Sequence, residues 1–306
     1  MTAGSAGPRT VVVTGAASQV GFFLVPRLVA AGFRVTAVSR RPEAAAIASF
    51  GPSWAGHGKA RWVRADLEQA ADDAAWSEGN AAWIHLGPLP LVPAVLARGG
   101  APAVRRVVAF GSTSRFTKAA STHPRERRIV ADLEAGEEGL ARGCSAHGVG
   151  WTLFRPTLIY GAGLDRNVMV IAGAIRRFRV FPLVGNGQGL RQPVHADDLA
   201  AACVSALDSP TSEGRAYDLS GGEVLSYREM VSRIFAVAGI APRLVPVPVG
   251  AVGFALWCLS RLPRYRDFNI EMARRMADDM VFSHDAAARD LGYRPRPFAP
   301  VVVPPG

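Results

Sequence analysis

Cysteine and lysine are both scarce in this chain of 306 residues. The three cysteines, Cys144, Cys203 and Cys258, are far apart in the sequence. Closely paired cysteines are the usual sign of a zinc site or a disulfide framework, so the sequence predicts neither a metal nor a disulfide, and we expect a cytoplasmic protein. Lys59 and Lys118 are the only lysines, and arginine carries nearly all of the positive charge behind the net charge of +10.

The sequence also lacks long apolar runs and nucleic-acid-binding signatures. The N-terminus has no apolar segment of the kind found in secretory signals. The longest apolar stretch, residues 245–262, has two prolines near its start, and its clean part, 249–262, is too short to span a bilayer. A packed helix is expected there, with peripheral membrane contact as the alternative. No helix-turn-helix, zinc-finger or RNA-binding motif accompanies the positive charge, which favours a small anionic substrate over nucleic acid.

What the sequence does contain is a regular alternation of strands and helices. Short runs rich in β-branched residues alternate with Ala-rich helical stretches, which predicts βαβ units in an α/β fold with a doubly wound parallel sheet of Rossmann type. After Gly161 the rhythm changes to amphipathic helices and a Gly-rich loop. We therefore expect a dinucleotide-binding domain at residues 1–165, to which 190–220 return, and a smaller C-terminal substrate lobe from residues 166–189 and 221–306.

A glycine-rich turn, "TGAASQVG", follows the first expected strand and opens the first expected helix. This context is typical of a dinucleotide-binding loop. Gly15 permits the tight turn, Gly21 permits close packing of the helix on the strand, and Ser18 takes the place of the middle glycine. The start of the helix, with Gln19 and Val20, would present unpaired N–H groups and a positive dipole end to a pyrophosphate.

The end of the second expected strand indicates which dinucleotide is preferred. An acid here would bind the adenosine ribose diol, whereas Arg40 and Arg41 would bind a 2′-phosphate, which predicts NADP(H) over NAD(H). The alternative is that the two arginines only solvate the strand end. An acid after the third strand would accept a hydrogen bond from the adenine amino group, and backbone at the end of the fourth would line the cofactor. These further predicted contacts are Asp66, Leu67, Leu86 and Gly87.

The order of the motifs resembles that of extended and atypical short-chain dehydrogenase/reductases of the NAD-dependent epimerase/dehydratase type. The glycine turn, "ADL", "HLG", "STS", "RPTLIYG" and "RQPVHADDLA" occur in the family's order. The resemblance implies a doubly wound sheet with a small C-terminal lobe, frequent nucleotide-sugar substrates and a possible homodimer. It also implies that Pro156 contacts the nicotinamide and that Arg191 contacts a substrate phosphate. One of the hydroxyls of Ser112, Thr113 and Ser114 would bind the substrate carbonyl.

The chain departs from that family at the catalytic Tyr-x-x-x-Lys. No tyrosine precedes Tyr160, and Val130 and Glu134 occupy the positions of the Tyr and the Lys. Val130 cannot transfer a proton, and Glu134 would repel a phenolate. Three replacements stay open for the proton donor: Tyr160, Lys118 or a bound water. His195 is a further candidate, either as an acid, a base or a substrate contact, or as a residue that orients the lobe interface.

Three hypotheses about function follow. The first is an NADP(H)-binding oxidoreductase or epimerase-like enzyme acting on a nucleotide sugar or related polar carbonyl. The second is a cofactor-binding sensor or scaffold without redox turnover, which loss of the Tyr and Lys would predict. The third is an isomerase or dehydratase that uses the fold without net hydride transfer.

Overall fold

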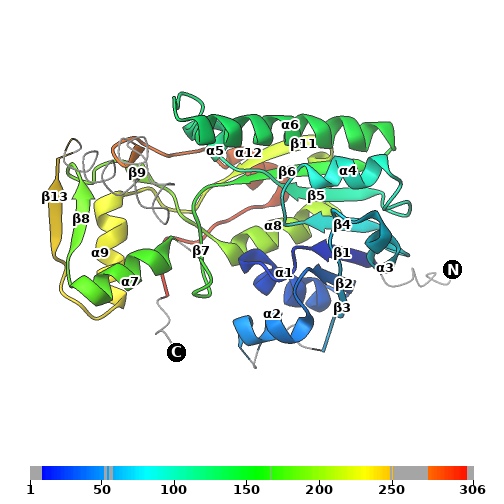
Figure 1. Ribbon diagram of the computed structural model, residues 1–306, viewed down its shortest axis with the longest axis horizontal. Helices are drawn as coiled ribbons and strands as arrows, with labels where there is room; N and C mark the ends of the chain where they lie inside the picture. Colours follow the sequence, from blue (N-terminus) through cyan, green and yellow to red (C-terminus); the bar gives the residue numbers. More distant parts are fainter. Residues whose placement is uncertain are drawn as a thin grey trace.

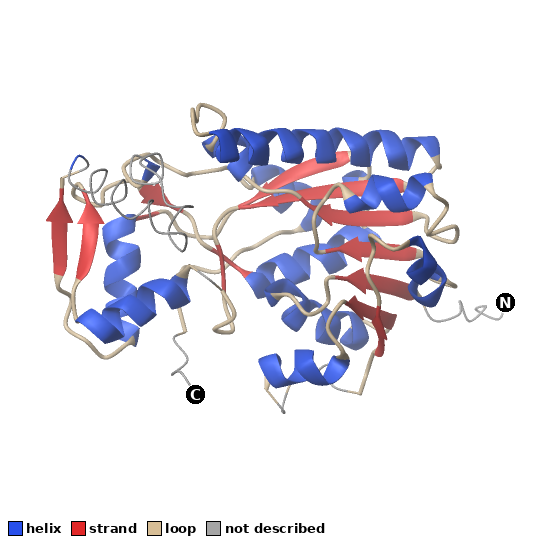
Figure 2. Cartoon of the chain, viewed as in Figure 1, coloured by secondary structure: helices blue, strands red, loops and turns tan. Residues whose placement is uncertain are grey.

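The computed structural model of the protein describes residues 9–51, 54, 58–165, 167–248, 250 and 275–301. Its centre is a seven-stranded parallel sheet with the strand order β11-β6-β5-β4-β1-β2-β3 (Figures 1 and 2). This order reverses direction at β1, so the predicted doubly wound parallel sheet is confirmed. The strands are β1 (Thr10–Thr14), β2 (Arg34–Ser39), β3 (Arg61–Arg64), β4 (Ala82–His85), β5 (Arg106–Phe110), β6 (Gly150–Pro156) and β11 (Arg215–Leu219).

Helices cover both faces of the sheet, and the alternation of side chains along β1 shows why. Val11 and Val13 belong to one apolar core and Val12 belongs to the other, and all three are fully buried. Successive side chains of a strand point to opposite faces, so a strand that is buried on both sides is apolar throughout. The first core includes α1 (Gln19–Ala30), α8 (Ala196–Asp208) and α12 (Asp285–Leu291); the second includes α3 (Asp73–Ser77), α4 (Leu91–Ala97) and α6 (Pro124–Ala146).

A smaller lobe lies beside the carboxyl ends of the strands (Figure 1). It has its own apolar core, formed largely by α7 (Val168–Phe178) and α9 (Tyr227–Val237), with the paired strands β8 (Phe181–Val184) and β13 (Leu244–Val247). Short strand pairs join the two parts: β7 (Ile159–Tyr160) with β10 (Val194–His195), and β9 (Leu190–Arg191) with β12 (Leu225–Ser226). The remaining short helices are α2 (Glu43–Phe50), η1 (Ala70–Asp72), α5 (Ser114–Thr117) and η2 (Pro210–Ser212).

The last helix differs from the sequence prediction. The predicted lobe takes in all of residues 221–306, but Ala287 and Leu291 of α12 are buried in the core between the sheet and α8. The short amphipathic sequence of α12 needs an apolar surface, and the edge strand β11 supplies one. No helix within the described ranges is long and apolar enough to cross a membrane. The stretch 249–262, for which the sequence leaves membrane contact open, lies outside the described residues except for residue 250.

Candidate functional site

A cleft of about 570 Å³ opens at the carboxyl ends of β1, β2, β3 and β4. The strand order reverses at β1, and ligands of doubly wound sheets bind at such reversal points. Most of the predicted cofactor contacts line this cleft: Gly15, Ser18, Arg40, Arg41, Asp66, Leu67, Leu86 and Gly87. The sequence therefore identified the main walls of the cleft.

The glycine turn forms the floor of the cleft next to α1. Gly15 has a φ of 77°, and the amides of Gly15 and Ala16 both donate to the Val38 carbonyl. A Cβ on Gly15 would lie 3.1 Å from the Leu86 carbonyl carbon, and one on Gly21 would lie 2.1 Å from the Ala16 carbonyl oxygen. Gly21 thus allows α1 to pack closely against the turn at Ala16. The sequence predicts this close contact on the strand, but it lies two residues beyond the end of β1.

The start of α1 fits the pyrophosphate of a dinucleotide. Ser18 is the N-cap, and its Oγ accepts a hydrogen bond from the Gly21 amide at 3.2 Å. The amides of Gln19 and Val20 have no acceptor within the described part of the chain, so they remain available to an anion. The Val20 side chain is buried in the core and can contribute only its amide. The Gln19 side chain points away from this cleft and donates to the Gly161 carbonyl at 3.1 Å.

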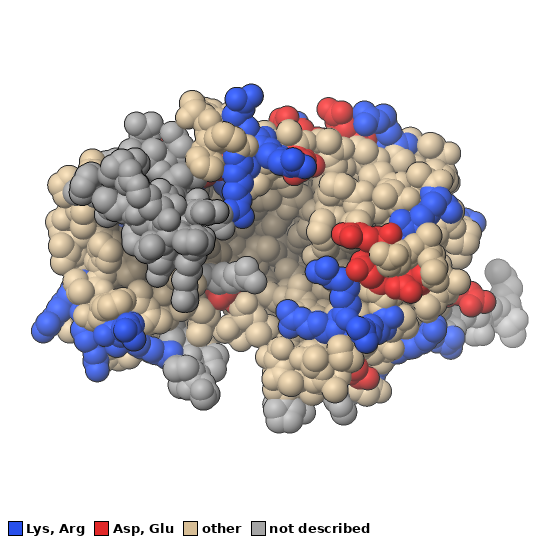
Figure 3. Space-filling view, in the orientation of Figure 1, with Lys and Arg blue, Asp and Glu red and all other residues tan. Residues whose placement is uncertain are grey.

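Basic side chains border the end of the cleft next to β2 and β3. Lys and Arg side chains gather on this face of the molecule beside α2 (Figure 3). Arg40 and Arg41 are exposed, and neither guanidinium has a hydrogen bond or ion pair to a described residue. Asp66 is held in place because its Oδ1 accepts a hydrogen bond from the Glu68 amide at 3.1 Å. The two guanidinium groups of Arg40 and Arg41, unpaired among the described residues, are compatible with a phosphorylated dinucleotide.

His85, at the end of β4, also lines this cleft and was missed by the sequence analysis. Trp83 Nε1 donates to Thr14 Oγ1 at 2.7 Å, which leaves the Thr14 hydroxyl to donate to His85 Nδ1, also at 2.7 Å. His85 Nε2 then donates to the Pro88 carbonyl at 3.0 Å. Burial lowers the pKa of His85 to about 4, so the ring is neutral and holds the 85–88 loop in place. The only signal in the sequence was a histidine within "HLGP".

A second cleft of about 400 Å³ adjoins the first at the N-terminus of α1. Ser18 lines the first cleft and its neighbour Gln19 lines the second. The second cleft lies between the sheet domain and the smaller lobe. Its lining is rich in hydroxyl and amide side chains: Gln19, Ser112, Thr113, Ser114, Thr117, Thr157, Leu158, Ile159, Asp165, Asn167, Arg191, Gln192, Met280 and Phe282.

The three hydroxyls after β5 have different roles in this cleft. The Thr113 hydroxyl donates to the Pro156 carbonyl at 3.0 Å, and the Thr113 side chain is buried. Ser112 Oγ accepts a hydrogen bond from the Ser114 amide at 3.1 Å, so its own hydroxyl proton remains free to donate. Thr113 therefore connects β5 to β6, and Ser112 and Ser114 are the hydroxyls available to a ligand. Pro156 lines neither cleft, and its predicted contact with the nicotinamide stays a prediction.

An ion-pair cluster lies where the family has its Tyr and Lys. Glu134 pairs with Arg115 at 3.6 Å, and the buried Glu137 pairs with both Arg115 and Arg155. A Cβ on Gly111 would lie 3.1 Å from Glu137 Oε1, so this carboxylate lies directly beside the end of β5. The sequence pointed to Glu134 but not to Glu137. The cluster fixes α5 against α6 and cannot replace a phenol as a proton donor.

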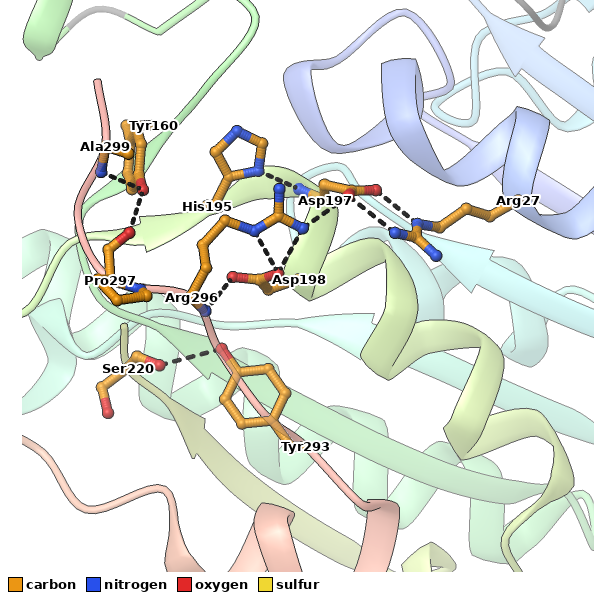
Figure 4. A network of polar contacts seen from close by, with 10 residues as sticks. All are labelled: Arg27, Tyr160, His195, Asp197, Asp198, Ser220, Tyr293, Arg296, Pro297 and Ala299. Atoms are coloured by element: carbon orange, nitrogen blue, oxygen red, sulfur yellow. Dashed lines mark hydrogen bonds and ion pairs between the residues drawn. The ribbon is translucent and has the colours of Figure 1, made fainter. Parts of the chain in front are cut away.

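Neither Lys118 nor Tyr160 lines the second cleft. Lys118 is the C-cap of α5, and partial burial lowers its pKa while Glu126 acts in the opposite direction. The Tyr160 hydroxyl donates to the Pro297 carbonyl at 3.2 Å and accepts from the Ala299 amide at 3.1 Å (Figure 4). The ring is 1% exposed, within the core of the smaller lobe. The predicted role of either residue as the proton donor is thus not supported, and bound water remains.

His195 and Arg191 mainly contact the protein itself. His195 Nδ1 accepts from the Asp197 amide at 3.1 Å, which caps α8, and its ring packs against Tyr160 (Figure 4). This arrangement fits the expected role of His195 as a residue that orients the lobe interface. Arg191 lines the second cleft, but its Nη1 donates to the carbonyls of residues 190 and 278 and its Nη2 to that of residue 275. A contact from Arg191 to a substrate phosphate stays a prediction.

The fold and the two adjoining clefts define a Rossmann-type protein with a dinucleotide site next to a smaller ligand site. The profile of the NAD dependent epimerase/dehydratase family matches residues 11–220, and the chain belongs to this family. The family is described as NAD dependent, which agrees with a nicotinamide dinucleotide as the ligand class of the first cleft.

Several curated relatives are named as reductases, including the two that follow. The chain is 28% identical to the (4-alkanoyl-5-oxo-2,5-dihydrofuran-3-yl)methyl phosphate reductase of Streptomyces griseus, over 94% of this chain and 95% of that one. It is also 28% identical to a 2-alkyl-3-oxoalkanoate reductase of Stenotrophomonas maltophilia, over 62% of this chain and 56% of that one. In that second case the match spans only about half of the relative's length.

Among solved structures, the UDP-glucuronic acid 4-epimerase of Bacillus cereus in complex with NAD is similar with a TM-score of 0.70 and 14% identity, covering 94% of this chain and 93% of that one. MoeE5 in complex with UDP-glucuronic acid and NAD is similar with a TM-score of 0.68 and 21% identity, covering 94% of each chain. At these identities the likeness shows the fold alone.

Proposed function

We propose that the protein is an NADP(H)-linked reductase of a polar carbonyl compound. The observation that carries this proposal is the junction of the two clefts at the N-terminus of α1, with Ser112 and Ser114 on the wall of the second cleft. A dinucleotide that lies along the first cleft would direct its nicotinamide toward these hydroxyls. The names of the two reductase relatives support a carbonyl substrate.

The preference for NADP(H) rests on Arg40 and Arg41. Both line the cofactor cleft beyond β2, and no acid occurs at positions 39–42. A guanidinium binds a phosphate through two parallel charge-assisted hydrogen bonds, which a ribose diol cannot match. We therefore expect the 2′-phosphate of NADP(H) to contact these two arginines.

The residues of the second cleft support reduction without a tyrosine. When bound, a reduced nicotinamide supplies a hydride to the carbonyl carbon. The Ser112 hydroxyl donates to the substrate oxygen and stabilises the negative charge that develops there. The ionisable side chains in the described lining are Asp165, which accepts from the Val168 amide at 2.6 Å, and Arg191. Neither is placed as a proton donor, so we propose that the oxygen takes its proton from water.

This mechanism is tested by removing the hydroxyl of Ser112. We expect Ser112→Ala to lower kcat/KM for NADPH-dependent carbonyl reduction by about a hundredfold, since loss of one donor to a developing oxyanion has effects of this size. The affinity for NADPH should not change, because Ser112 lies outside the cofactor cleft. Ser145→Ala, an exposed serine near the end of α6, is the matched control. Unchanged turnover in Ser112→Ala would contradict the mechanism.

A second candidate is a cofactor-binding protein without redox turnover. The substitution of Val130 and Glu134 for the catalytic Tyr and Lys favours it. Tight NADPH binding without consumption, across a panel of 4-keto nucleotide sugars and simple ketones, would favour this candidate. Conversion of a substrate with no net change in NADPH would instead indicate an isomerase or dehydratase.

A further inference from the structure

The loop that carries Arg40 and Arg41 is held by the edge strand β3. Arg64 Nε donates to the Arg40 carbonyl at 3.2 Å, and Trp62 Nε1 donates to the Arg41 carbonyl at 3.3 Å. Within the loop, the Arg41 amide donates to Ser39 Oγ at 3.0 Å. Three hydrogen bonds thus fix the backbone from which the two arginine side chains extend. A loop fixed in this way loses little conformational entropy when a ligand binds.

Arg64 also reaches a recess that continues the cofactor cleft. The recess has a volume of about 360 Å³ and is lined by Arg40, Arg64, Ala65, Asp66 and Asp72. Three of these residues, Arg40, Ala65 and Asp66, line the cofactor cleft as well. A group that projects from the adenosine end of the cleft would therefore enter the recess beside Arg64.

The recess is lined by two arginines and two aspartates, and the arginine side chains keep free donors for an anion. The bond from Arg64 to the Arg40 carbonyl uses only Nε, so both Nη groups stay available for a bidentate contact. No carboxylate in the described part of the chain forms an ion pair with Arg40, Arg41 or Arg64. The two acids are directed to backbone: Asp72 Oδ2 accepts from the Asp66 amide at 2.8 Å, and Asp66 Oδ1 accepts from the Glu68 amide at 3.1 Å.

We propose that Arg64 is a third guanidinium for the 2′-phosphate of NADP(H), and that it determines cofactor specificity together with Arg40 and Arg41. This inference rests on the proposed function. It adds a residue from β3, a strand that the sequence analysis connected only with the adenine. The phosphate would lie at the mouth of the recess, between Arg64 on β3 and the loop after β2.

The test separates the charge of Arg64 from its hydrogen bond to the loop. Arg64→Gln keeps an N–H donor for the Arg40 carbonyl and removes the charge, whereas Arg64→Lys keeps a charge. We expect Arg64→Gln to weaken NADPH binding about tenfold or more, the usual effect of one charge-assisted contact, and to leave the affinity for NADH unchanged. Arg64→Lys should recover part of the loss. The measurement is calorimetric titration of the purified full chain with each dinucleotide at low and at high salt.

The matched control is Arg61→Gln, at the other end of the same exposed strand, where Arg61 donates to the Ala75 carbonyl. This variant should bind both dinucleotides as the wild type does. The loss in Arg64→Gln should also shrink at high salt, because salt screens exposed charges. An equal loss for NADPH and NADH would assign Arg64 a purely structural role and overturn the inference. An unchanged preference for NADPH in Arg64→Gln would also overturn the inference about Arg64 but would leave the proposed function intact. If the wild type does not prefer NADPH, both the inference and the proposed NADP(H) dependence are wrong.

Discussion

His85 links the cofactor cleft to the pH dependence of stability. Burial lowers its pKa in the folded chain to about 4, against an ordinary value of 6.5. Between these two values the unfolded chain binds more protons than the folded one. The contribution of His85 to stability is therefore fully present above pH 6.5 and is lost as the pH falls toward 4, by about 3 kcal/mol.

Urea unfolding at a series of pH values checks this prediction. The wild type should lose stability between pH 6.5 and pH 4 more steeply than His85→Gln, which cannot take up the proton. His147→Gln, at an exposed position, should follow the wild type. If His85→Gln and the wild type show the same pH dependence, the ring is not buried and neutral as described.

At the scale of single residues, sequence reasoning succeeded where the signal is local. Gly15 and Ser18 lie within one short turn, and both line the first cleft. The hydroxyl of Tyr160, a predicted proton donor, is bonded to residues 297 and 299, which no local pattern places next to it. Glu137 was missed for a similar reason, since its partners Arg115 and Arg155 come from two other elements.

Among the elements, helix α1 depends on close contact with the turn before it. A Cβ on Gly21 would lie 2.1 Å from the Ala16 carbonyl oxygen, which is backbone and cannot move aside cheaply. We expect Gly21→Ala to destabilise the fold by roughly 1–3 kcal/mol, the usual range for overpacking, and to weaken dinucleotide binding as α1 shifts. Gly173→Ala in α7, where a Cβ would meet no atom within 4 Å, should be neutral or stabilising.

Thermal unfolding and NADPH titration of the two variants measure both effects. If Gly21→Ala is as stable as the wild type and binds NADPH equally well, the close contact between α1 and the turn is not required. The elements themselves were predictable, because the central strands β1, β4 and β5 are short runs that are largely apolar and buried. The docking of α12 was not, since its few apolar residues give no indication of which surface they cover.

Across the whole molecule, the C-terminal residues 294–300 connect the two parts of the chain. Arg296 pairs with Asp197 and with the buried Asp198 on α8 (Figure 4). Phe298 is buried in the core of the smaller lobe. The Asp198 carboxylate loses its ion-pair partner if Arg296 is removed. We expect Arg296→Ala to destabilise the protein by about 2 kcal/mol, less than for a fully buried pair because the Arg296 side chain is 42% exposed.

Arg294→Ala, at an exposed position two residues earlier, is the matched control for this variant. Denaturant unfolding monitored by tryptophan fluorescence compares the two. Equal stability of Arg296→Ala and Arg294→Ala would show that this segment does not hold the lobe in place.

The C-terminal segment also shows the limit of sequence analysis at this scale, because contacts about a hundred residues apart leave no periodic pattern.

We propose above that the first cleft binds NADP(H) through Arg40 and Arg41. The most direct measurement is calorimetric titration of the nucleotide-free protein with NADPH and with NADH. We predict tighter binding of NADPH, loss of that preference when Arg40 and Arg41 are both changed to Ala, and no effect of Arg34→Ala at the opposite end of β2. Equal affinity for the two dinucleotides, or a preference for NADPH that persists without both arginines, would contradict the account.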